Sequence, residues 1–352
     1  MSTFERLADL RLEVEGYELE GLSAHVSSGF ERLSTVVHLR GGGEEGLGED
    51  VVYDAKDHVA WQTAGAVHNL AGHYTLGEFC VRVNALDLFP VAPQREVSRL
   101  YRRWTFHSAA LDLGLRQAGR PLHEALGRPV HPLTFVVSMR LGDPATLAPI
   151  ESRLANYPTL RFKLDATSSW TAELIDALVQ TGAVDSVDFK ALYKGTVVDV
   201  EPDPALYERV VAAFPDAWLE DPDVVTEGTA QALADEHDRI TWDAPIHSIA
   251  DIEALPFPPR MVNLKPSRVG GLKKLCDTYD YCDEHGIGAY GGGQFELGVG
   301  RGQAQYLASV FHPDTPNDLA PSGYNEDDPR PGLPSSPLSP APDRTGFRWS
   351  AS

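Results

Sequence analysis

Five ionisable residues stand at regular intervals in the middle of the chain, each where a short apolar run gives way to a turn. An acid at the end of a single strand is usually a solvated loop residue, but a succession of such positions calls for another explanation. Parallel strands present their carboxyl ends at one mouth of a barrel, so these side chains should converge there. In chain order, and about 22 to 32 residues apart, they are Lys163, Asp188, Glu220, Asp243 and Lys265.

The three carboxylates among them predict a metal site. Carboxylates that converge on one point repel one another strongly unless a cation lies between them. Because this series contains neither histidine nor cysteine, the ligands are oxygens only, and such sites prefer a hard cation. We therefore expect Asp188, Glu220 and Asp243 to bind Mg²⁺, with Mn²⁺ or Ca²⁺ as the next choices.

The two lysines flank this site and predict general acid–base chemistry. A lysine beside a divalent cation is pushed toward its neutral form, which makes it a usable base near neutral pH. Lys163 or Lys265 would remove the α-proton of a carboxylate substrate, and the metal would stabilise the enolate. Arg161 should share the inward face with Lys163, because side chains alternate along a strand, and should help keep Lys163 neutral. On this reasoning Lys163 is the primary base.

The elements that must position these residues read as repeated strand–helix units. From about residue 133, short apolar runs such as "LTFVVSM", "AWLE" and "MVNLK" alternate with helical stretches such as "TAELIDALVQTG". Such units form either an open doubly wound sheet or a barrel, and their number favours the barrel. Ser138, at the end of the first barrel strand, is either a hydrogen-bond donor to the substrate or a residue that fills the barrel.

The two ends of the chain have a different texture. Residues 10–60 alternate in an antiparallel β pattern with a glycine-rich hairpin, and residues 94–127 have helical periodicity with a Gly-Arg-Pro break. The proline-rich C-terminal segment carries Phe347 and Trp349, so we expect an arm that packs back on the first unit. The predicted domains are an α+β unit at 1–130, a barrel at 131–322 and an arm at 323–352.

Several motifs together resemble the enolase superfamily, in its muconate-lactonizing-enzyme-like subgroup (the mandelate racemase/muconate lactonizing enzyme family). They are "RFKLD" (161–165), "SVDFK" (186–190), "WLEDP" (218–222), "NLKPSRVGGL" (263–272) and "GGGQFELGVGRG" (291–302). The resemblance implies an α+β capping domain on a (β/α)7β TIM-like barrel, with the C-terminal arm returning to the cap. It also implies Mg²⁺ on the three carboxylates and an acid–base pair, Lys163 and Lys265, on opposite faces of the substrate. Glu296 matches an acidic position of the family at the end of the seventh strand.

Three positions depart from the family pattern. The second strand usually carries Lys-x-Lys, and here Arg161 takes the first place. The third strand usually reads Asp-x-Asn, and here Lys190 takes the last place, as an extra cation that either shifts substrate choice or points outward. Asp165-Ala166 stands in place of the commoner glycine after the base. These changes leave the reaction class intact and the substrate open.

The predicted function is therefore Mg²⁺-dependent abstraction of a carboxylate α-proton, leading to racemisation or epimerisation, cycloisomerisation or syn-dehydration. The resemblance favours an o-succinylbenzoate-synthase-like or N-acylamino-acid-racemase-like enzyme. The family's dipeptide epimerases carry Asp-x-Asp on the last strand, and Asp318-Leu319-Ala320 argues against them. Its sugar-acid dehydratases use a His-Asp pair in place of Lys265, so the lysine in this chain argues against them too. Two alternatives stay open: a metal-independent Schiff-base aldolase that uses a barrel lysine, and a non-catalytic carboxylate-binding homologue.

Charge, the N-terminal sequence and the cysteine content limit the classes of partner and the cell compartment that we expect for this protein. A formal net charge of −21 argues against nucleic acid and anionic membranes, and no apolar run is long enough to span a bilayer. The N-terminus lacks the pattern of a signal peptide, and the three cysteines are too scattered for a disulfide framework. The G-x-G-x-x-G match at 286–291 follows a helix, so it predicts a helix end and a strand rather than a dinucleotide site. We expect a cytoplasmic homo-oligomer that binds a small carboxylate and no organic cofactor.

Overall fold

Alternating apolar and polar residues near the N-terminus produce an antiparallel sheet. Its strands are β2 (Gly16–His25), β3 (Glu31–Gly41) and β4 (Glu44–Asp50). Gly42 and Gly43 form the predicted hairpin turn, and both have the positive φ angles that glycine adopts without strain. The computed structural model describes residues 1–25, 31–196, 198–326 and 328–350.

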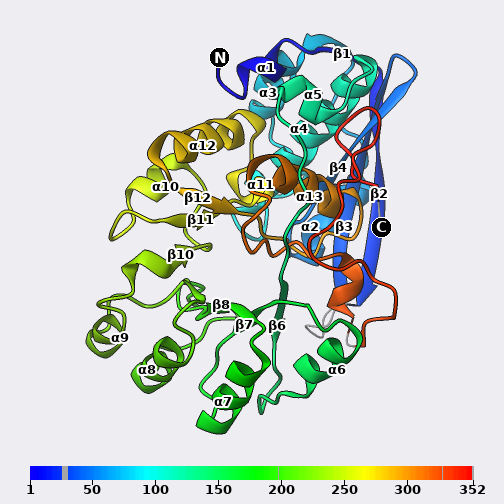
Figure 1. Cartoon of the computed structure of the whole chain (residues 1–352). Helices are drawn as coiled ribbons and strands as arrows, with labels where there is room; N and C mark the ends of the chain where they lie inside the picture. Colours follow the sequence, from blue (N-terminus) through cyan, green and yellow to red (C-terminus); the bar gives the residue numbers. More distant parts are fainter. Residues whose placement is uncertain (26–30, 197, 327, 351–352) are drawn as a thin grey trace.

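A long helix, α4 (Ser98–Gln117), packs across this sheet and completes the cap. Glycines permit the close approach, because a Cβ on Gly48 of β4 would lie 2.0 Å from the Thr105 carbonyl oxygen of α4. Figure 1 shows most of the cap in blue and cyan. Its remaining elements are α1 (Glu5–Ala8), β1 (Arg11–Val14), α2 (Ala55–Ala64), β5 (Gly72–Thr75), α3 (Leu76–Asn84) and α5 (Leu122–Leu126).

The short apolar runs of the second part form strands that pair in parallel and in chain order, from β6 to β12. Consecutive order is the pattern of a barrel, whereas the strand order of a doubly wound sheet reverses. The strands are β6 (Val137–Arg140), β7 (Phe162–Asp165), β8 (Val184–Asp188), β9 (Trp218–Glu220), β10 (Ile240–Trp242), β11 (Met261–Asn263) and β12 (Gly288–Tyr290).

Two residues connect the first and last strands of this sheet. Asn317 bridges in parallel to Phe135, just before β6, and Asp318 bridges in parallel to Gly292, just after β12. The N–H of Val136 donates to the Asn317 carbonyl oxygen at 2.8 Å. The predicted (β/α)7β barrel with a cap is therefore confirmed, with its eighth strand reduced to bridge residues.

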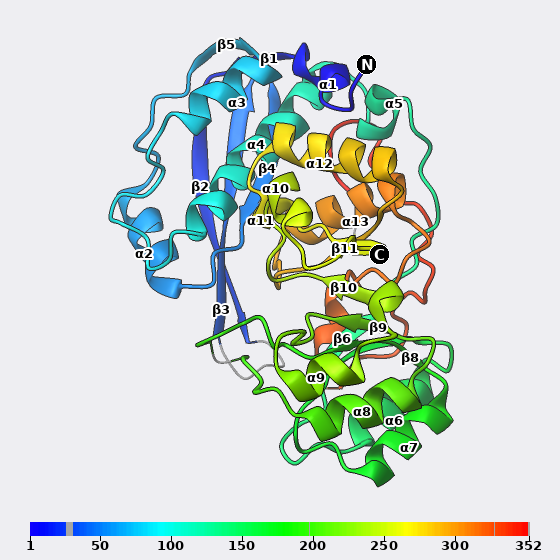
Figure 2. The ribbon, with the colours of Figure 1, turned by 90° about the vertical axis from the view of Figure 1, so that its left-hand side faces the viewer.

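Helices cover the outside of the barrel, and Figure 2 shows α6 to α9 as a layer on one side of the strands. Gly286 ends α12 in the left-handed conformation and leads into β12, so the G-x-G-x-x-G match is a helix end followed by a strand. None of the helices in the described ranges has the length and apolar character that a membrane span requires. The helices are α6 (Ala148–Asn156), α7 (Ala172–Thr181), α8 (Pro204–Ala213), α9 (Glu227–Ala232), α10 (Ile249–Glu253), α11 (Pro266–Val269), α12 (Leu272–His285) and α13 (Val299–Phe311).

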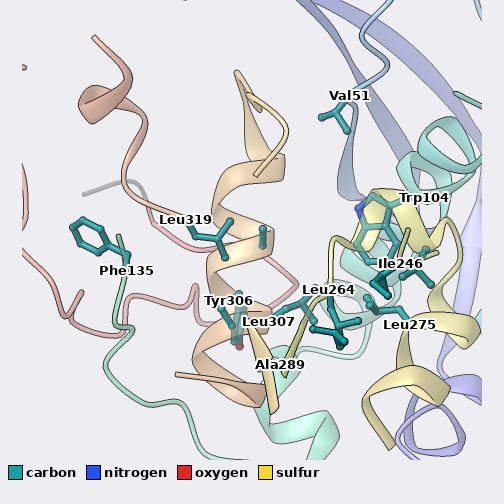
Figure 3. Packing of buried hydrophobic residues seen from close by; sticks show 14 of the residues in the cluster. Val51, Trp104, Phe135, Ile246, Leu264, Leu275, Ala289, Tyr306, Leu307 and Leu319 are labelled. Atoms are coloured by element: carbon teal, nitrogen blue, oxygen red, sulfur yellow. The ribbon is translucent and has the colours of Figure 1, made fainter. Parts of the chain in front are cut away.

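The cap and the barrel share a hydrophobic core. Figure 3 shows Trp104 of α4 in the same cluster as Leu264, Leu275 and Leu307 of the barrel. All four side chains are less than a tenth exposed. The core therefore fixes the cap against the barrel, which is what a site at their junction requires.

The C-terminal arm returns to the cap, as predicted. Phe347 is buried and packs edge-on against Trp104, with ring centroids 6.5 Å apart. Asp112 of α4 accepts hydrogen bonds from the Phe347 N–H and from Arg348 Nε, both at 2.7 Å. Figure 1 shows this segment in red beside β4 and β2.

Candidate active site at the mouth of the barrel

The structure brings the five predicted site residues together in one buried cluster. Asp188 ends β8 and Glu220 ends β9. Asp243 directly follows β10, and Lys265 lies two residues after the end of β11. Lys163 lies inside β7, which continues to Asp165. Each of the five is less than a tenth exposed. Their roles stay predictions, but their positions allow the predicted chemistry.

The lysines lie at opposite ends of the row of carboxylates. The Lys163 ammonium donates to Glu220 and lies 3.2 Å from Asp188 Oδ2. The Lys265 ammonium lies 2.7 Å from Asp243 Oδ2. Because β7 and β11 stand on either side of the three strands that carry the acids, a molecule lying over the carboxylates would have one lysine on each side.

The two lysines differ in pKa. Burial lowers the pKa of Lys163, but the carboxylates of Glu220 and Asp188 outweigh it and hold this pKa well above its ordinary value. Burial also lowers the pKa of Lys265, and Asp243 opposes that shift less effectively because the Arg268 guanidinium lies nearby. The net pKa of Lys265 is below its ordinary value. Lys265, and not Lys163 as expected from the sequence, is therefore the amine that loses its proton more readily in this structure.

The prediction that Arg161 faces the site is wrong. β7 begins at Phe162, and its pairing with β8 shifts register between Phe162 and Lys163, so the strand alternation does not reach back to Arg161. Its guanidinium instead donates to Asp185 at 2.8 Å, and the side chain is 40% exposed. Arg161 therefore binds Asp185 and does not point into the site beside Lys163.

The carboxylates fit a hard divalent cation. Oxygens of Asp188, Glu220 and Asp221 all lie within 4.8 Å of one another, and all three side chains are fully buried. Among the described residues, this close group of oxygens contains Asp221 and does not include Asp243, the third ligand expected from the sequence. Asp221 accepts the backbone N–H groups of Asp243 and Ala244 at 2.8 Å each, so both its oxygens already have partners. Oxygen donors alone favour Mg²⁺ or Mn²⁺.

Two further basic residues contact these acids. Arg268 Nη1 lies 2.6 Å from Asp243 Oδ1 and also donates to the Asp243 carbonyl oxygen. The Lys190 ammonium donates to Asp188 Oδ2, so this residue points into the site rather than outward. With Lys163 and Lys265, four basic side chains thus contact Asp188, Glu220 and Asp243.

Two tyrosine hydroxyls also bind the carboxylates. Tyr193, in the segment after β8, donates to Asp243 Oδ2 at 2.7 Å, and Tyr290 of β12 donates to Glu220 Oε2. Burial and the nearby carboxylates raise the pKa of both hydroxyls well above the ordinary value. Both are therefore hydrogen-bond donors at neutral pH.

The bridge that closes the barrel adds an acid to the site. Asp318 Oδ2 lies 3.7 Å from the Lys163 ammonium, and burial raises the pKa of its carboxyl group. Asn263 of β11 is 1% exposed, and neither of its side-chain polar atoms has a hydrogen-bond partner among the described residues. It lies near Lys265, since a Cβ on Gly292 would contact both side chains. The unpaired amide is thus available to a bound molecule.

The two supporting residues predicted with less detail lie near the site. Ser138 of β6 pairs in register with Lys163 of β7, so both side chains lie on the same face of the sheet. Glu296 follows β12 in the loop 291–298, where its carboxylate lies 3.0 Å from Arg301 and accepts the Gln294 N–H at 2.7 Å. A substrate contact by Ser138 or Glu296 stays a prediction.

The cap holds this loop in place. Glu49, at the end of β4, accepts the N–H groups of Leu297 at 2.7 Å and Gly300 at 2.8 Å. Arg32 of β3 is 1% exposed and donates to the Gln294 carbonyl oxygen at 3.1 Å. The rim of the barrel is therefore fastened to the cap by buried polar contacts.

Sequence reasoning missed Arg268, Tyr193, Tyr290 and Asp318. Arg268 had a usable signal, because it follows Lys265 by three residues in the short helix α11 and so lies on the same side of the turn. Tyr193 reaches the site from a loop, Tyr290 from a strand three places from β9 in the sheet, and Asp318 from a bridge of single residues. No local periodicity marks such positions.

The capped barrel has the fold of solved structures from the enolase superfamily, so the predicted resemblance is confirmed. A solved structure of a dipeptide epimerase from Methylococcus capsulatus, in complex with Mg and the dipeptide L-Arg-D-Lys, has a TM-score of 0.69 at 18% identity, covering 96% of this chain and 99% of that one. A member of the enolase superfamily from Listeria innocua has a TM-score of 0.63 at 18% identity, covering 88% of this chain and 86% of that one.

This chain belongs to the family described as the domain of unknown function DUF8230. The N-terminal domain of that family matches residues 5–125 and the C-terminal domain matches residues 129–326. Among relatives, an o-succinylbenzoate synthase from Geobacillus stearothermophilus is 27% identical over 80% of this chain and 75% of its own length. An N-succinylamino acid racemase from Amycolatopsis is 27% identical over 79% of this chain and 76% of its own length.

Proposed function

We propose that the protein is a metal-dependent enzyme of the isomerase or lyase type that removes the α-proton of a carboxylate substrate. One observation carries the proposal: Lys163 and Lys265 lie at opposite ends of a row of buried carboxylates. Such a pair can act on both faces of a carbon atom held between them. The relatives named as a synthase and a racemase support the same reaction class.

The proposed metal is Mg²⁺, with Mn²⁺ as the alternative, bound by Asp188, Glu220 and Asp243. When bound, the cation would supply the positive charge that stabilises an enolate. The oxygen-only side chains support Mg²⁺, as does the Mg in the solved dipeptide epimerase. Asp188 and Glu220 belong to the close group of oxygens, whose third member is Asp221, and Asp243 is proposed as the third ligand from the sequence. The ammonium groups of Lys163 and Lys265, which now contact the carboxylates, would turn toward the substrate.

The pKa difference between the lysines suggests how they divide the work. Lys265, with its lowered pKa, is suited to take a proton from the α-carbon. Lys163, with its raised pKa, keeps its proton and is suited to deliver it to the opposite face. In racemisation the roles exchange for the other enantiomer. In a dehydration one lysine is the base, and the other stabilises negative charge as a cation.

The names of the relatives indicate which class of substrate to test first. Both o-succinylbenzoate and an N-succinylamino acid contain a succinyl group and a carboxylate. We therefore propose N-succinylamino acids as first probes, within a wider set of carboxylic acids. A cytoplasmic location and a homo-oligomeric state also belong to the proposal; size-exclusion chromatography tests the second.

The decisive experiment follows deuterium incorporation at the α-carbon in D₂O with Mg²⁺, by mass spectrometry, across that set of acids. We expect exchange that EDTA stops and that Mg²⁺ or Mn²⁺ restores. Glu220→Gln should abolish exchange, whereas Arg161→Ala, outside the site, should not. Absence of exchange from every acid tested would contradict the proposal. Borohydride trapping of a keto substrate on Lys163 or Lys265 would support a Schiff-base aldolase instead.

A further inference from the structure

One ammonium group in the site lies between two carboxylates with different roles. Lys190 Nζ donates to Asp188 Oδ2 and lies 3.5 Å from Asp165 Oδ1. Asp188 is a proposed metal ligand and Asp165 is not. The two acids lie on adjacent strands in direct register, Asp165 on β7 and Asp188 on β8. A small rotation of the lysine side chain therefore moves its charge from one acid to the other.

The backbone directs Lys190 at Asp188. Lys190 follows β8 by two residues and has a φ of 52°, a left-handed conformation that is uncommon for residues other than glycine. Its N–H donates to Asp188 Oδ1 at 2.9 Å, while its ammonium binds Oδ2. One residue thus contacts both oxygens of this carboxylate, and Asp188 is fully buried.

Asp165 is built to receive the ammonium group. Its side chain is 14% exposed, and its Oδ2 lies 3.7 Å from Arg140 Nε, which leaves Oδ1 facing Lys190. Both Asp165 and Lys190 stood out in the sequence as departures from the expected pattern. In the structure these two departures form one ion pair.

We propose that Lys190 is an internal cation that occupies Asp188 without metal and moves to Asp165 when a divalent cation binds, and that this exchange sets the metal affinity of the site. The inference rests on the proposed function, because it takes Asp188 as a metal ligand. A cation bound to Asp188 would lie about 2.1 Å from its oxygen and so close to the ammonium of Lys190. Like charges repel strongly in a buried site, where salt screens them little.

The test measures metal binding rather than turnover. Mn²⁺ affinity of metal-free protein is determined by titration calorimetry and by electron paramagnetic resonance. Lys190→Met, which keeps an unbranched side chain only one heavy atom shorter and removes the charge, should raise the affinity about tenfold or more because the competing charge is gone. Lys190→Arg keeps the charge and should stay within about threefold of the wild type. Lys194→Met is the matched control, since that lysine is 58% exposed in the same segment, and it should leave the affinity unchanged.

A double-mutant cycle tests the movement to Asp165. Asp165→Asn should lower Mn²⁺ affinity about tenfold in the wild type, because Lys190 loses its alternative partner, and less than about threefold in Lys190→Met. An equal fall in both backgrounds would overturn the exchange. Thermal melting without metal verifies that each variant folds, and Lys190→Asn replaces Lys190→Met if that variant does not.

The outcomes separate this inference from the function on which it rests. Mn²⁺ affinity that is the same in wild type, Lys190→Met and Lys190→Asn overturns the role of Lys190 and leaves the metal-dependent function standing. Absence of Mn²⁺ binding in the wild type and in every variant overturns both.

Discussion

Replacing Asp243 and Asp221 one at a time by asparagine decides which of them is the third metal ligand. We expect Asp243→Asn to lower Mg²⁺ affinity at least about 100-fold, whereas Asp221→Asn should change it less than about fivefold. The reason lies in their existing contacts. Asp221 has a left-handed φ of 46° and binds two backbone N–H groups at 2.8 Å, so its carboxylate is already committed to the chain.

The expected magnitude follows from charge and distance. A 100-fold change in affinity corresponds to about 2.7 kcal/mol. A unit negative charge about 2.1 Å from a divalent cation contributes roughly 16 kcal/mol gross at an effective dielectric constant of about 20, so this net loss is a small part of the gross attraction. Asp243→Asn also leaves Lys265, now 2.7 Å from Oδ2, and Arg268, 2.6 Å from Oδ1, without their counter-charge beside the metal. Both effects act against the cation.

Titration calorimetry of metal-free protein with Mg²⁺ and Mn²⁺ measures the affinities, and urea unfolding verifies the fold of each variant. The reasoning is refuted if Asp221→Asn loses affinity 100-fold while Asp243→Asn keeps it. That result would assign the metal to the group of oxygens within 4.8 Å, namely those of Asp188, Glu220 and Asp221.

Four further predictions follow from the same structure. Lys163→Ala and Lys265→Ala should each slow α-proton exchange about 100-fold or more, each for a different enantiomer if the enzyme is a racemase, and undiminished exchange in both would contradict the mechanism. Arg161→Ala should change the free energy of unfolding by less than about 1 kcal/mol in urea, because its ion pair is partly exposed, and a larger loss would show a structural role. Burial raises the pKa of the Asp221 carboxyl group to about 7 in the folded protein. Between pH about 4 and about 7 the native state therefore holds a proton that the unfolded state has lost. Without metal, the free energy of unfolding should fall by up to about 4 kcal/mol as the pH rises through this range. Urea midpoints across that range should be flatter in Asp221→Asn, and equal slopes would count against the raised pKa. Phe347→Ala should cost about 3–5 kcal/mol in thermal or urea unfolding, and a cost below about 1 kcal/mol would deny the arm a role in stability.

The parts of the fold that could be predicted have local signals. The apolar runs that end at Asp188 and Glu220 coincide with the ends of β8 and β9, and Gly42 and Gly43 mark a turn that needs positive φ. Phe347 indicated an arm that packs, because a free tail rarely carries large aromatic residues. The domain limits at residues 130 and 322 and the catalytic roles stay predictions.

The parts that could not be predicted depend on contacts between distant segments. Strand alternation placed Arg161 inward, but alternation holds only inside a strand, and β7 begins one residue later. Tyr193 reaches Asp243 across fifty residues of sequence, and Asp318 enters the site through an isolated bridge. The sequence does not decide whether Lys190 points into the site or outward, because the sign of its φ sets the direction of the side chain and the sequence does not reveal that sign for a lysine.

The packing of the C-terminal arm against the cap has a consequence for folding during biosynthesis. Asp112 of the cap accepts the N–H of Leu47 at 2.9 Å as well as the N–H of Phe347 at 2.7 Å, so one buried carboxylate joins an early strand to the arm. During translation, Phe347 leaves the ribosome after every helix and strand of the cap and barrel. Domains generally fold as they emerge, N-terminal first. Until the whole barrel has been synthesised, the nascent cap therefore has Trp104 uncovered on one side, and Asp112 lacks the hydrogen bonds that Phe347 and Arg348 later donate.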